Sequence, residues 1–331
     1  MHRLIKVGGT AVIFASMLTV NASSATADPP ADDRTCKPGA VYKLSDAEEV
    51  KKFKIRKKDC DLSDMTVVGD NVGAAVPVPG NFVNAHMTAV DGQDSHLTLE
   101  VDLDTGDVTI DGTEQAEGQS SGGGGGTSTA FCGGTGGTAG PEYWHRAPTY
   151  YINAATYPRY ASQADWVSRL QNAASTWRNS TNRCGYAQRT TTNLNLAYQG
   201  NTSRSAGISD NNICTSYDGY SVISGGALNG ILGGSCRTGS SANTSITESD
   251  IKIDGFDVPY IAPGTPCTSG EFDLYTVAVH EFGHYIGLGH SGEASYPTLV
   301  MSNNIGACEY NWTLGAGDYA RVSAKYYPFG Y

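Results

Sequence analysis

Residues 280–291 read HEFGHYIGLGHS and hold three of the seven histidines in the chain. On a helix, positions i and i+4 lie on one face, so the rings of His280 and His284 can reach a single metal ion. A helix that continued to His290 would carry it about 9 Å along the axis and about 240° around it. The chain must therefore leave the helix, and Gly287 can adopt the left-handed conformation that ends helices. The spacing predicts a metal site to which His290 returns as a third ligand.

Glu281 follows the first predicted ligand directly and points about 100° away from it on a helix. It therefore borders the metal without binding it. Three protein ligands leave the fourth position of a tetrahedral zinc ion open for water, which is typical of a catalytic site. A glutamate in this place suits a general base that acts on that water. HExxH alone occurs by chance, but the added Gly287 and His290 lower the chance to on the order of 10⁻⁵ in this composition.

The stretch resembles the signature of the metzincin metallopeptidases, HExxHxxGxxH followed downstream by a methionine turn. The matching residues are His280, Glu281, His284, Gly287 and His290, with Met301 as the candidate turn. Gly283 and Ser291 narrow the resemblance to the matrixin branch. It implies a zinc metalloendopeptidase with one catalytic zinc ion, Glu281 as the catalytic residue and Met301 as a hydrophobic floor beneath the ligands.

Residues 141–331 carry the resemblance, which implies an α+β fold. The expected fold has a twisted mixed sheet, a zinc-binding active-site helix and a C-terminal helix. Hydrophobic periodicity predicts the elements in turn. These are a strand over 148–152, a helix capped by Ser162, strands over 192–198 and 246–253, a helix from about Asp273 that carries the zinc ligands, and a last helix over 318–326.

Three segments precede this region. Residues 1–27 have a basic start, an apolar run and an Ala-x-Ala site, which predicts a secretory signal peptide; a retained membrane anchor is the alternative. Residues 28–116 form a small β-rich N-terminal region with a hairpin over 96–111. Residues 117–140 form a Gly/Ser/Thr-rich linker. We expect 28–116 to be a removable prosegment, with a permanent accessory domain as the open alternative.

Eight cysteines in an exported chain favour disulfides. Cys36 and Cys60 can pair within the N-terminal region. The last five cysteines are an odd number, so Cys132 is expected to join them and stay with the enzyme after a cut between about 120 and 132. The alternative is that Cys132 plugs the zinc, as Cys-Gly does in matrixins, although the matrixin prosegment motif PRCGxPD is absent. If Cys132 is in a disulfide, Asp70 is a candidate plug that resembles the aspartate of astacins.

The net charge of −11 argues against nucleic acid or an anionic membrane as a partner. We expect a secreted monomer that acts on extended polypeptides. His145 is the only histidine between the linker and His280, so no second, structural zinc site is expected. The resemblance also implies structural calcium, for which the loops offer Asp210, Asp218, Asp254 and Asp257 without a spacing that identifies a site.

In metzincins an extended substrate pairs with an exposed edge strand above the zinc helix, and residues 228–237 (LNGILGGSCR) hold the matching position. Its candidate contacts are Gly230, Leu232 and Gly233, because glycines let another backbone approach. An ordinary loop closed by Cys236 is the alternative.

The pocket for the residue after the cut is expected from Asn303, Asn304, Tyr310 and Trp312. A different class of function also stays open: a secreted, non-catalytic binding module or adhesin on a decayed peptidase fold. The intact Glu281 argues for the enzyme, because a binding module has no need of a general base.

Overall fold

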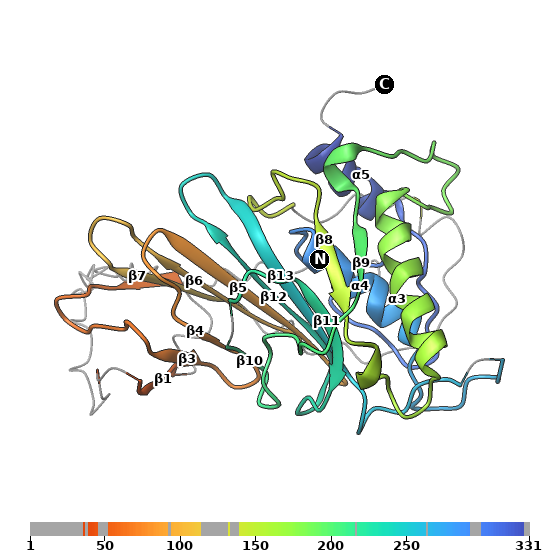
Figure 1. Cartoon of the computed structure of the whole chain (residues 1–331), viewed down its shortest axis with the longest axis horizontal. Helices are drawn as coiled ribbons and strands as arrows, with labels where there is room; N and C mark the ends of the chain where they lie inside the picture. The colour runs from red at the N-terminus through yellow and green to blue at the C-terminus, as the bar shows by residue number, and fades with distance from the viewer. Residues whose placement is uncertain are drawn as a thin grey trace, which may run out of the picture. The chain divides into compact units, whose positions relative to one another are not determined.

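The computed structural model describes residues 36, 39–45, 52–91, 94–113, 132, 139–215, 217–262, 264–291 and 299–327. The predicted signal peptide and most of the predicted linker lie outside these residues. The described residues form three α-helices and two sheets (Figure 1). None of these helices is both long and apolar enough to cross a membrane.

A nine-stranded mixed sheet runs through both the N-terminal region and residues 141–331. Its strands in spatial order are β2 (Lys52–Ile55), β7 (Val108–Thr113), β6 (Ser95–Val101), β5 (Asn81–Ala89), β12 (Ile231–Ser240), β13 (Ser245–Asp254), β11 (Val222–Gly226), β8 (Thr149–Ile152) and β9 (Ala197–Asn201). The strands from β2 to β13 pair antiparallel, and those from β13 to β9 pair parallel. This is the mixed sheet that the resemblance implied.

The three helices are α3 (Gln163–Arg178), α4 (Leu274–Tyr285) and α5 (Ala316–Tyr326). As predicted, Ser162 caps α3, with its hydroxyl accepting a hydrogen bond from the backbone N–H of Asp165 at 3.0 Å. The apolar stripe of α3 is fully buried at Trp166, Leu170 and Trp177. α3 packs against α4, and α4 packs against β12 and β13. The helix with the predicted ligands is therefore buried between another helix and the sheet.

The predicted strand over 192–198 is only partly correct. Residues Thr192–Leu194 form a 3₁₀ turn (η2), and the strand β9 begins at Ala197. The hydroxyl of Thr191 accepts a hydrogen bond from the backbone N–H of Asn193 at 3.3 Å. Such local side-chain bonds compete with strand pairing in Thr- and Asn-rich sequence, and periodicity does not detect them.

The N-terminal region is β-rich, as predicted, and its β6–β7 hairpin is confirmed. A second, four-stranded sheet contains β1 (Val41–Lys43), β3 (Thr66–Val68), β4 (Gly73–Ala75) and β10 (Ile213–Cys214). Both sheets thus combine strands from before and after the linker. The two parts also share a hydrophobic core, in which Val83 and Leu97 cluster with Leu228 and Ile231.

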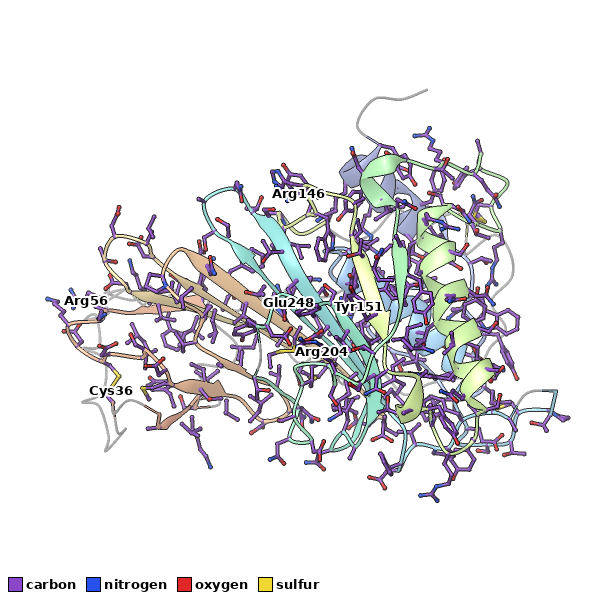
Figure 2. The ribbon with its side chains drawn as sticks, in the orientation of Figure 1. Cys36, Arg56, Arg146, Tyr151, Arg204 and Glu248 are labelled. Atoms are coloured by element: carbon purple, nitrogen blue, oxygen red, sulfur yellow. A yellow bond between two sulfur atoms is a disulfide. The ribbon has the colours of Figure 1, made fainter. Side chains whose placement is uncertain are left out.

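All eight cysteines are in disulfides: Cys36–Cys60, Cys132–Cys184, Cys214–Cys236 and Cys267–Cys308. The first bridge lies within the N-terminal region (Cys36 is labelled in Figure 2). The second confirms that Cys132 pairs with a cysteine of the C-terminal region. It follows that Cys132 is not a zinc plug.

Candidate active site

The helix α4 begins at a side-chain cap and ends at the predicted glycine. Asp273 caps it by accepting a hydrogen bond from the backbone N–H of Thr276 at 2.7 Å. At the other end Gly287 has φ +82°, a left-handed conformation. This turn directs the chain away from the helix axis and back toward His290, as the spacing predicted.

Two hydrogen bonds close the end of α4. The backbone N–H groups of Gly287 and Leu288 donate to the carbonyl oxygens of His284 and Gly283 at 2.8 and 3.0 Å. This pair of bonds is the Schellman motif, which satisfies carbonyl groups that the helix leaves without partners. The glycine is therefore required by the backbone conformation on which the third ligand depends.

The Nε2 atoms of the three predicted ligands meet at one point. The separations are 3.0 Å between His280 and His284, 3.1 Å between His284 and His290, and 3.3 Å between His280 and His290. Two ligands of a tetrahedral zinc ion with bonds of about 2.0–2.1 Å are about 3.3 Å apart. The triangle therefore fits three nitrogen ligands of one zinc ion.

The rings also have the tautomer that a metal needs. Nδ1 of His280 lies 2.7 Å from the carbonyl oxygen of Val300, and Nδ1 of His284 lies 2.9 Å from that of Leu288. A carbonyl only accepts, so Nδ1 carries the hydrogen and Nε2 keeps its lone pair. Burial is the main reason why the pKa of His280 falls to about 3 and that of His284 falls well below its usual value. Both rings are therefore neutral near pH 7, as ligands must be.

Glu281 is fully buried beside this triangle. Its Oε1 accepts a hydrogen bond from the hydroxyl of Thr88 at 2.8 Å, and its Oε2 has no hydrogen-bond partner among the described residues. Burial raises the pKa of Glu281 to about 8; the Thr88 bond opposes this shift and the charge of Asp94 adds to it. A Cβ at Gly233 would lie 3.1 Å from both Cγ and Oε1 of Glu281, so this β12 glycine leaves room for the carboxyl group.

Met301 is fully buried and packs on α4 at Gly283, where any side chain would overlap its sulfur. This contact explains the glycine in the motif and fits the expected hydrophobic floor. The Asp318 carboxylate, at the start of α5, accepts hydrogen bonds from the backbone N–H groups of Val300 and Met301 at 2.9 and 3.2 Å. Asp318 is itself paired with Arg321 at 3.0 Å. No sequence motif indicated that α5 holds this turn in place.

Three side chains of the N-terminal region reach the same site, and sequence reasoning missed all of them. Thr88 contacts Glu281, as described above. The ring of His86 stacks on that of His284, with centroids 4.1 Å apart. Oδ2 of Asp94 lies 2.9 Å from Nε2 of His290. Only the pairing of distant strands brings these residues here, and no local pattern reports that.

The prediction that residues 228–237 form an exposed edge strand is wrong for the whole chain. β12 does lie above α4, but β5 pairs with it antiparallel along its length, from Ile231↔Ala89 to Ser240↔Asn81. β12 is therefore an interior strand between β5 and β13. The sequence correctly predicted that this strand lies against the helix with the metal ligands, but it did not predict that β5 pairs with it.

The candidate substrate residues lie in two places. Gly233 lies beside Glu281, and Leu232 is buried with its carbonyl oxygen accepting a hydrogen bond from Tyr260 at 3.0 Å. Gly230 lies in the turn before β12, with φ +70°. Tyr310 and Trp312 are 42% and 40% exposed and lie near the start of α4, where the Trp312 indole donates to the capping Asp273. Their part in binding a substrate stays a prediction.

The candidate plug Asp70 lies in the turn between β3 and β4. Among the described residues, two groups of three side chains could hold a metal: His86 with His284 and His290, and Asp94 with His280 and His290. Asp70 belongs to neither, so the structure places Asp94 where Asp70 was expected.

The four calcium candidates also lie outside these two groups. Asp210 is paired with Lys252 at 2.7 Å, and Asp218 with Arg204 at 2.7 Å. Asp254 is buried and accepts hydrogen bonds from backbone N–H groups, including that of Asp257. Three of these carboxylates thus have protein partners, and calcium binding at them stays a prediction.

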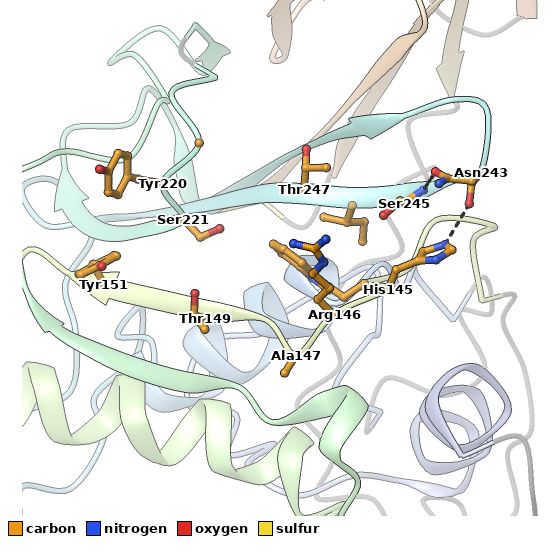
Figure 3. Close-up of a pocket in the computed structure, with 13 residues that line it drawn as sticks. His145, Arg146, Ala147, Thr149, Tyr151, Tyr220, Ser221, Asn243, Ser245 and Thr247 are labelled. Carbon is orange, nitrogen blue, oxygen red and sulfur yellow. Dashed lines mark hydrogen bonds between the residues drawn. The ribbon is translucent and has the colours of Figure 1, made fainter.

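A cavity of about 580 Å³ lies elsewhere, along β8 and β13 (Figure 3). Thr149, Tyr151, Ser221 and Thr247 are among its lining residues, together with His145 and Arg146. It contains no carboxylate and none of the three metal-site histidines. Because neither Glu281 nor any of the three predicted metal ligands lines it, this cavity is separate from the candidate hydrolytic site.

Three imidazoles around one point, with a buried carboxyl group beside them, define a candidate metallopeptidase site on an α+β fold. A comparison with protein-family models finds a match to the family described as Matrixin over residues 142–327, which is more than half of the chain. The chain therefore belongs to the matrixin family of metallopeptidases. We refer to residues 142–327 as the matrixin region.

Proposed function

We propose that this protein is a secreted zinc metalloendopeptidase. The observation that carries the proposal is the triangle of Nε2 atoms of His280, His284 and His290, with the carboxyl group of Glu281 beside it. Membership of the matrixin family supports the peptidase class. The complete ligand set and the retained glutamate support an active enzyme over a binding module on a decayed fold.

A zinc ion held by the three imidazoles would supply a Lewis acid for the scissile carbonyl and would lower the pKa of water to about 7. Glu281 accepts the proton of the attacking water and passes it to the leaving amine. Its buried Oε2, which has no partner among the described residues, is available for that proton. Burial raises the pKa of Glu281 in the full chain, and the positive charge of a zinc ion at the three imidazoles would lower it toward the carboxylate form that accepts a proton.

The substrate is an extended polypeptide that pairs with β12 in the processed form, from which β5 has been removed. This strand lies next to Glu281, and its glycines let a second backbone approach closely. The antiparallel pairing of β5 with β12 supports this proposal, because a substrate strand would take up the same backbone hydrogen bonds once β5 is removed. Asn303, Asn304, Tyr310 and Trp312 would wall the pocket for the residue after the cut. We propose a monomer with no nucleic-acid or membrane partner.

Secretion and processing complete the proposal. Four disulfides fit an oxidising compartment outside the cytosol. Residues 28–116 are the prosegment, and a cut between about 120 and 132 yields the processed form. The Cys132–Cys184 bridge ties Cys132 to the matrixin region, so the start of the processed chain stays attached.

The test is the processed form with Glu281→Ala or Glu281→Gln. Cleavage of a denatured protein should fall by about 10²–10⁴-fold, the usual contribution of a general acid–base group, while bound zinc measured by atomic absorption stays at one ion. Glu142→Ala, at a partly exposed glutamate outside the site, is the matched control. Undiminished cleavage by the Glu281 variants would contradict the mechanism. Profiling of cut sites in a peptide library would then define the preference of the pocket.

A further inference from the structure

Asp94 is a buried carboxylate, and one of its oxygens has no hydrogen-bond partner among the described residues. It lies just before β6 and is only 4% exposed. Its Oδ1 accepts a hydrogen bond from the backbone N–H of Ala89 at 3.2 Å. Its Oδ2 is buried and lies 2.9 Å from Nε2 of His290, without the geometry of a hydrogen bond. A buried anionic oxygen is costly unless a donor or a cation compensates it.

A metal ion bound at the three histidines would compensate the charge of this oxygen, because the oxygen lies beside the metal position. Nε2 of His290 faces the Nε2 atoms of His280 and His284, so an atom next to it lies at the metal position. Asp94, His280 and His290 form one of the two groups of potential ligands among the described residues. Carboxylate oxygens bind zinc at about 2.0–2.2 Å, so an oxygen and a nitrogen on one tetrahedral ion lie about 3.3 Å apart. We infer that Asp94 is a fourth protein ligand of the metal in the full chain.

His86 is the rival for the fourth position, because it also groups with His284 and His290. Its ring is nearly parallel to that of His284, at 17°, with centroids 4.1 Å apart. An imidazole binds a metal through a lone pair in its own ring plane. An ion in the plane of His284 therefore lies outside the parallel plane of His86. His86 covers a ligand, and Asp94 completes the ligand set.

The fourth ligand belongs to a segment that closes the site in three ways. β5 pairs with β12, which is the strand that we propose pairs with substrate. Thr88, near the end of β5, donates to Glu281. Asp94, five residues after Ala89, takes the position that water needs at a catalytic zinc. Residues 81–94 thus occupy the substrate strand, the general base and the open metal position together. This inference rests on the proposed zinc peptidase, whose latency it explains.

The test uses the full chain loaded with Co²⁺ in place of zinc, because the visible spectrum of cobalt reports its ligands without any turnover. Asp94→Asn keeps the shape of the side chain and an oxygen for the Ala89 bond. The unmodified chain should show no spectral change with azide, since no position is open. The Asp94→Asn chain should respond to azide and should bind zinc at least about ten-fold more weakly in competition with a chelator. Asp91→Asn, at an exposed carboxylate three residues before Asp94, is the control and should behave like the unmodified chain.

A second variant tests the ligand directly. All eight cysteines are in disulfides, so Asp94→Cys introduces a single thiol. If position 94 is a ligand, the cobalt-loaded chain gains a near-ultraviolet band from sulfur-to-cobalt charge transfer. The absence of that band, or an Asp94→Asn chain with unchanged azide response and zinc affinity, would overturn the inference. So would a site that His86→Phe opens and Asp94→Asn does not.

The two proposals can fail separately. If Asp94→Asn opens the cobalt site and the processed form cleaves no peptide, the proposed peptidase function falls and the ligand assignment stands. If the processed form is active and Asp94→Asn changes nothing, the assignment alone falls. A full chain that binds neither cobalt nor zinc would refute both.

Discussion

The two regions that meet at the metal site are built in different ways. In the matrixin region, His280, Glu281 and His284 are neighbours on one helix, and a single glycine turn returns His290 to them. In the N-terminal region, Thr88 reaches Glu281 across 193 residues of sequence. One arrangement is local and the other depends on strand pairing. We therefore expect the three histidines and Glu281 to keep their arrangement when the N-terminal region is removed.

The N-terminal region is nevertheless joined to the matrixin region by backbone pairing and by a shared core. β5 shares backbone hydrogen bonds with β12, and β4 pairs with β10 of the matrixin region. Leu228 and Ile231 are buried in a core that is otherwise formed mainly by the N-terminal region. Removal of the N-terminal region would expose this apolar surface beside β12. We expect extended substrates with apolar side chains to pack on the same surface.

The largest expected effect is the contrast between the full chain and the processed form. A tethered segment that pairs with β12 acts at an effective concentration of about millimolar or more, so the N-terminal region should exclude free peptides. Peptide cleavage by the processed form should exceed that of the full chain by at least about a hundred-fold. The processed form should begin between about residues 120 and 132, by mass spectrometry, and show no titratable thiol when denatured without reductant.

Two results would contradict the predicted difference between the full chain and the processed form. Equal cleavage with residues 28–116 still covalently attached and uncut would make the N-terminal region a permanent accessory domain. A free thiol in a chain that starts before Cys132 would contradict the disulfide assignment. An uncleavable linker, made by replacing the Gly/Ser/Thr-rich segment, provides the matched full-chain control.

A smaller effect tests the glycine turn that returns His290 to the helix. Gly287→Ala places a side chain where φ is +82° and where it would overlap the carbonyl oxygen of Glu142. We expect the free energy of unfolding of the processed form to fall by about 3 kcal/mol, with loss of zinc. Gly270→Ala is the control, because its φ of +88° is equally unfavourable but the space around it is open. We expect Gly270→Ala to lower the free energy of unfolding by about 1 kcal/mol. Equal losses of unfolding free energy in the two variants, measured by urea unfolding, would show that the contact with Glu142 does not destabilise Gly287→Ala.

The same contrast explains how much the sequence could predict. The zinc helix, its glycine turn, the Ser162 cap and the β6–β7 hairpin follow from local periodicity and side-chain chemistry, and each is found. Cysteine parity placed Cys132 correctly. The positions of Thr88 and Asp94 could not be found in this way, because the register of β5 on β12 is set by packing across the whole sheet. The short turn at Thr192 also escaped prediction, since local hydrogen bonds replaced strand pairing there.

The smallest expected effect is a pH dependence that belongs to the matrixin region alone. Burial raises the pKa of Glu248 (Figure 2) from 4.5 to about 7, and backbone N–H groups of Gly219 and Asp218 oppose the shift. Between those pH values the folded state keeps the proton that the unfolded state loses. Stability from this group is therefore complete below about pH 4.5 and is lost as the pH rises through about 7.

Glu248→Gln should remove this dependence. Between pH 5 and 7 the free energy of unfolding of the unmodified processed form should fall by on the order of 2 kcal/mol more than that of the variant. Because the hydrogen-bond partners of Glu248 all belong to the matrixin region, the same difference should appear in the full chain. A pH dependence that differs between the two forms would show that the N-terminal region also acts on this part of the sheet.

The most direct test of the account is a crystal structure of the zinc-loaded full chain with anomalous scattering measured at the zinc edge. The account predicts one strong peak, about 2.0–2.1 Å from Nε2 of His280, His284 and His290, with Glu281 beside the ion and not bound to it. It further predicts β5 in place on β12 above that peak. No peak at the centre of the three histidines, or a zinc ion held elsewhere in the chain, would contradict the account.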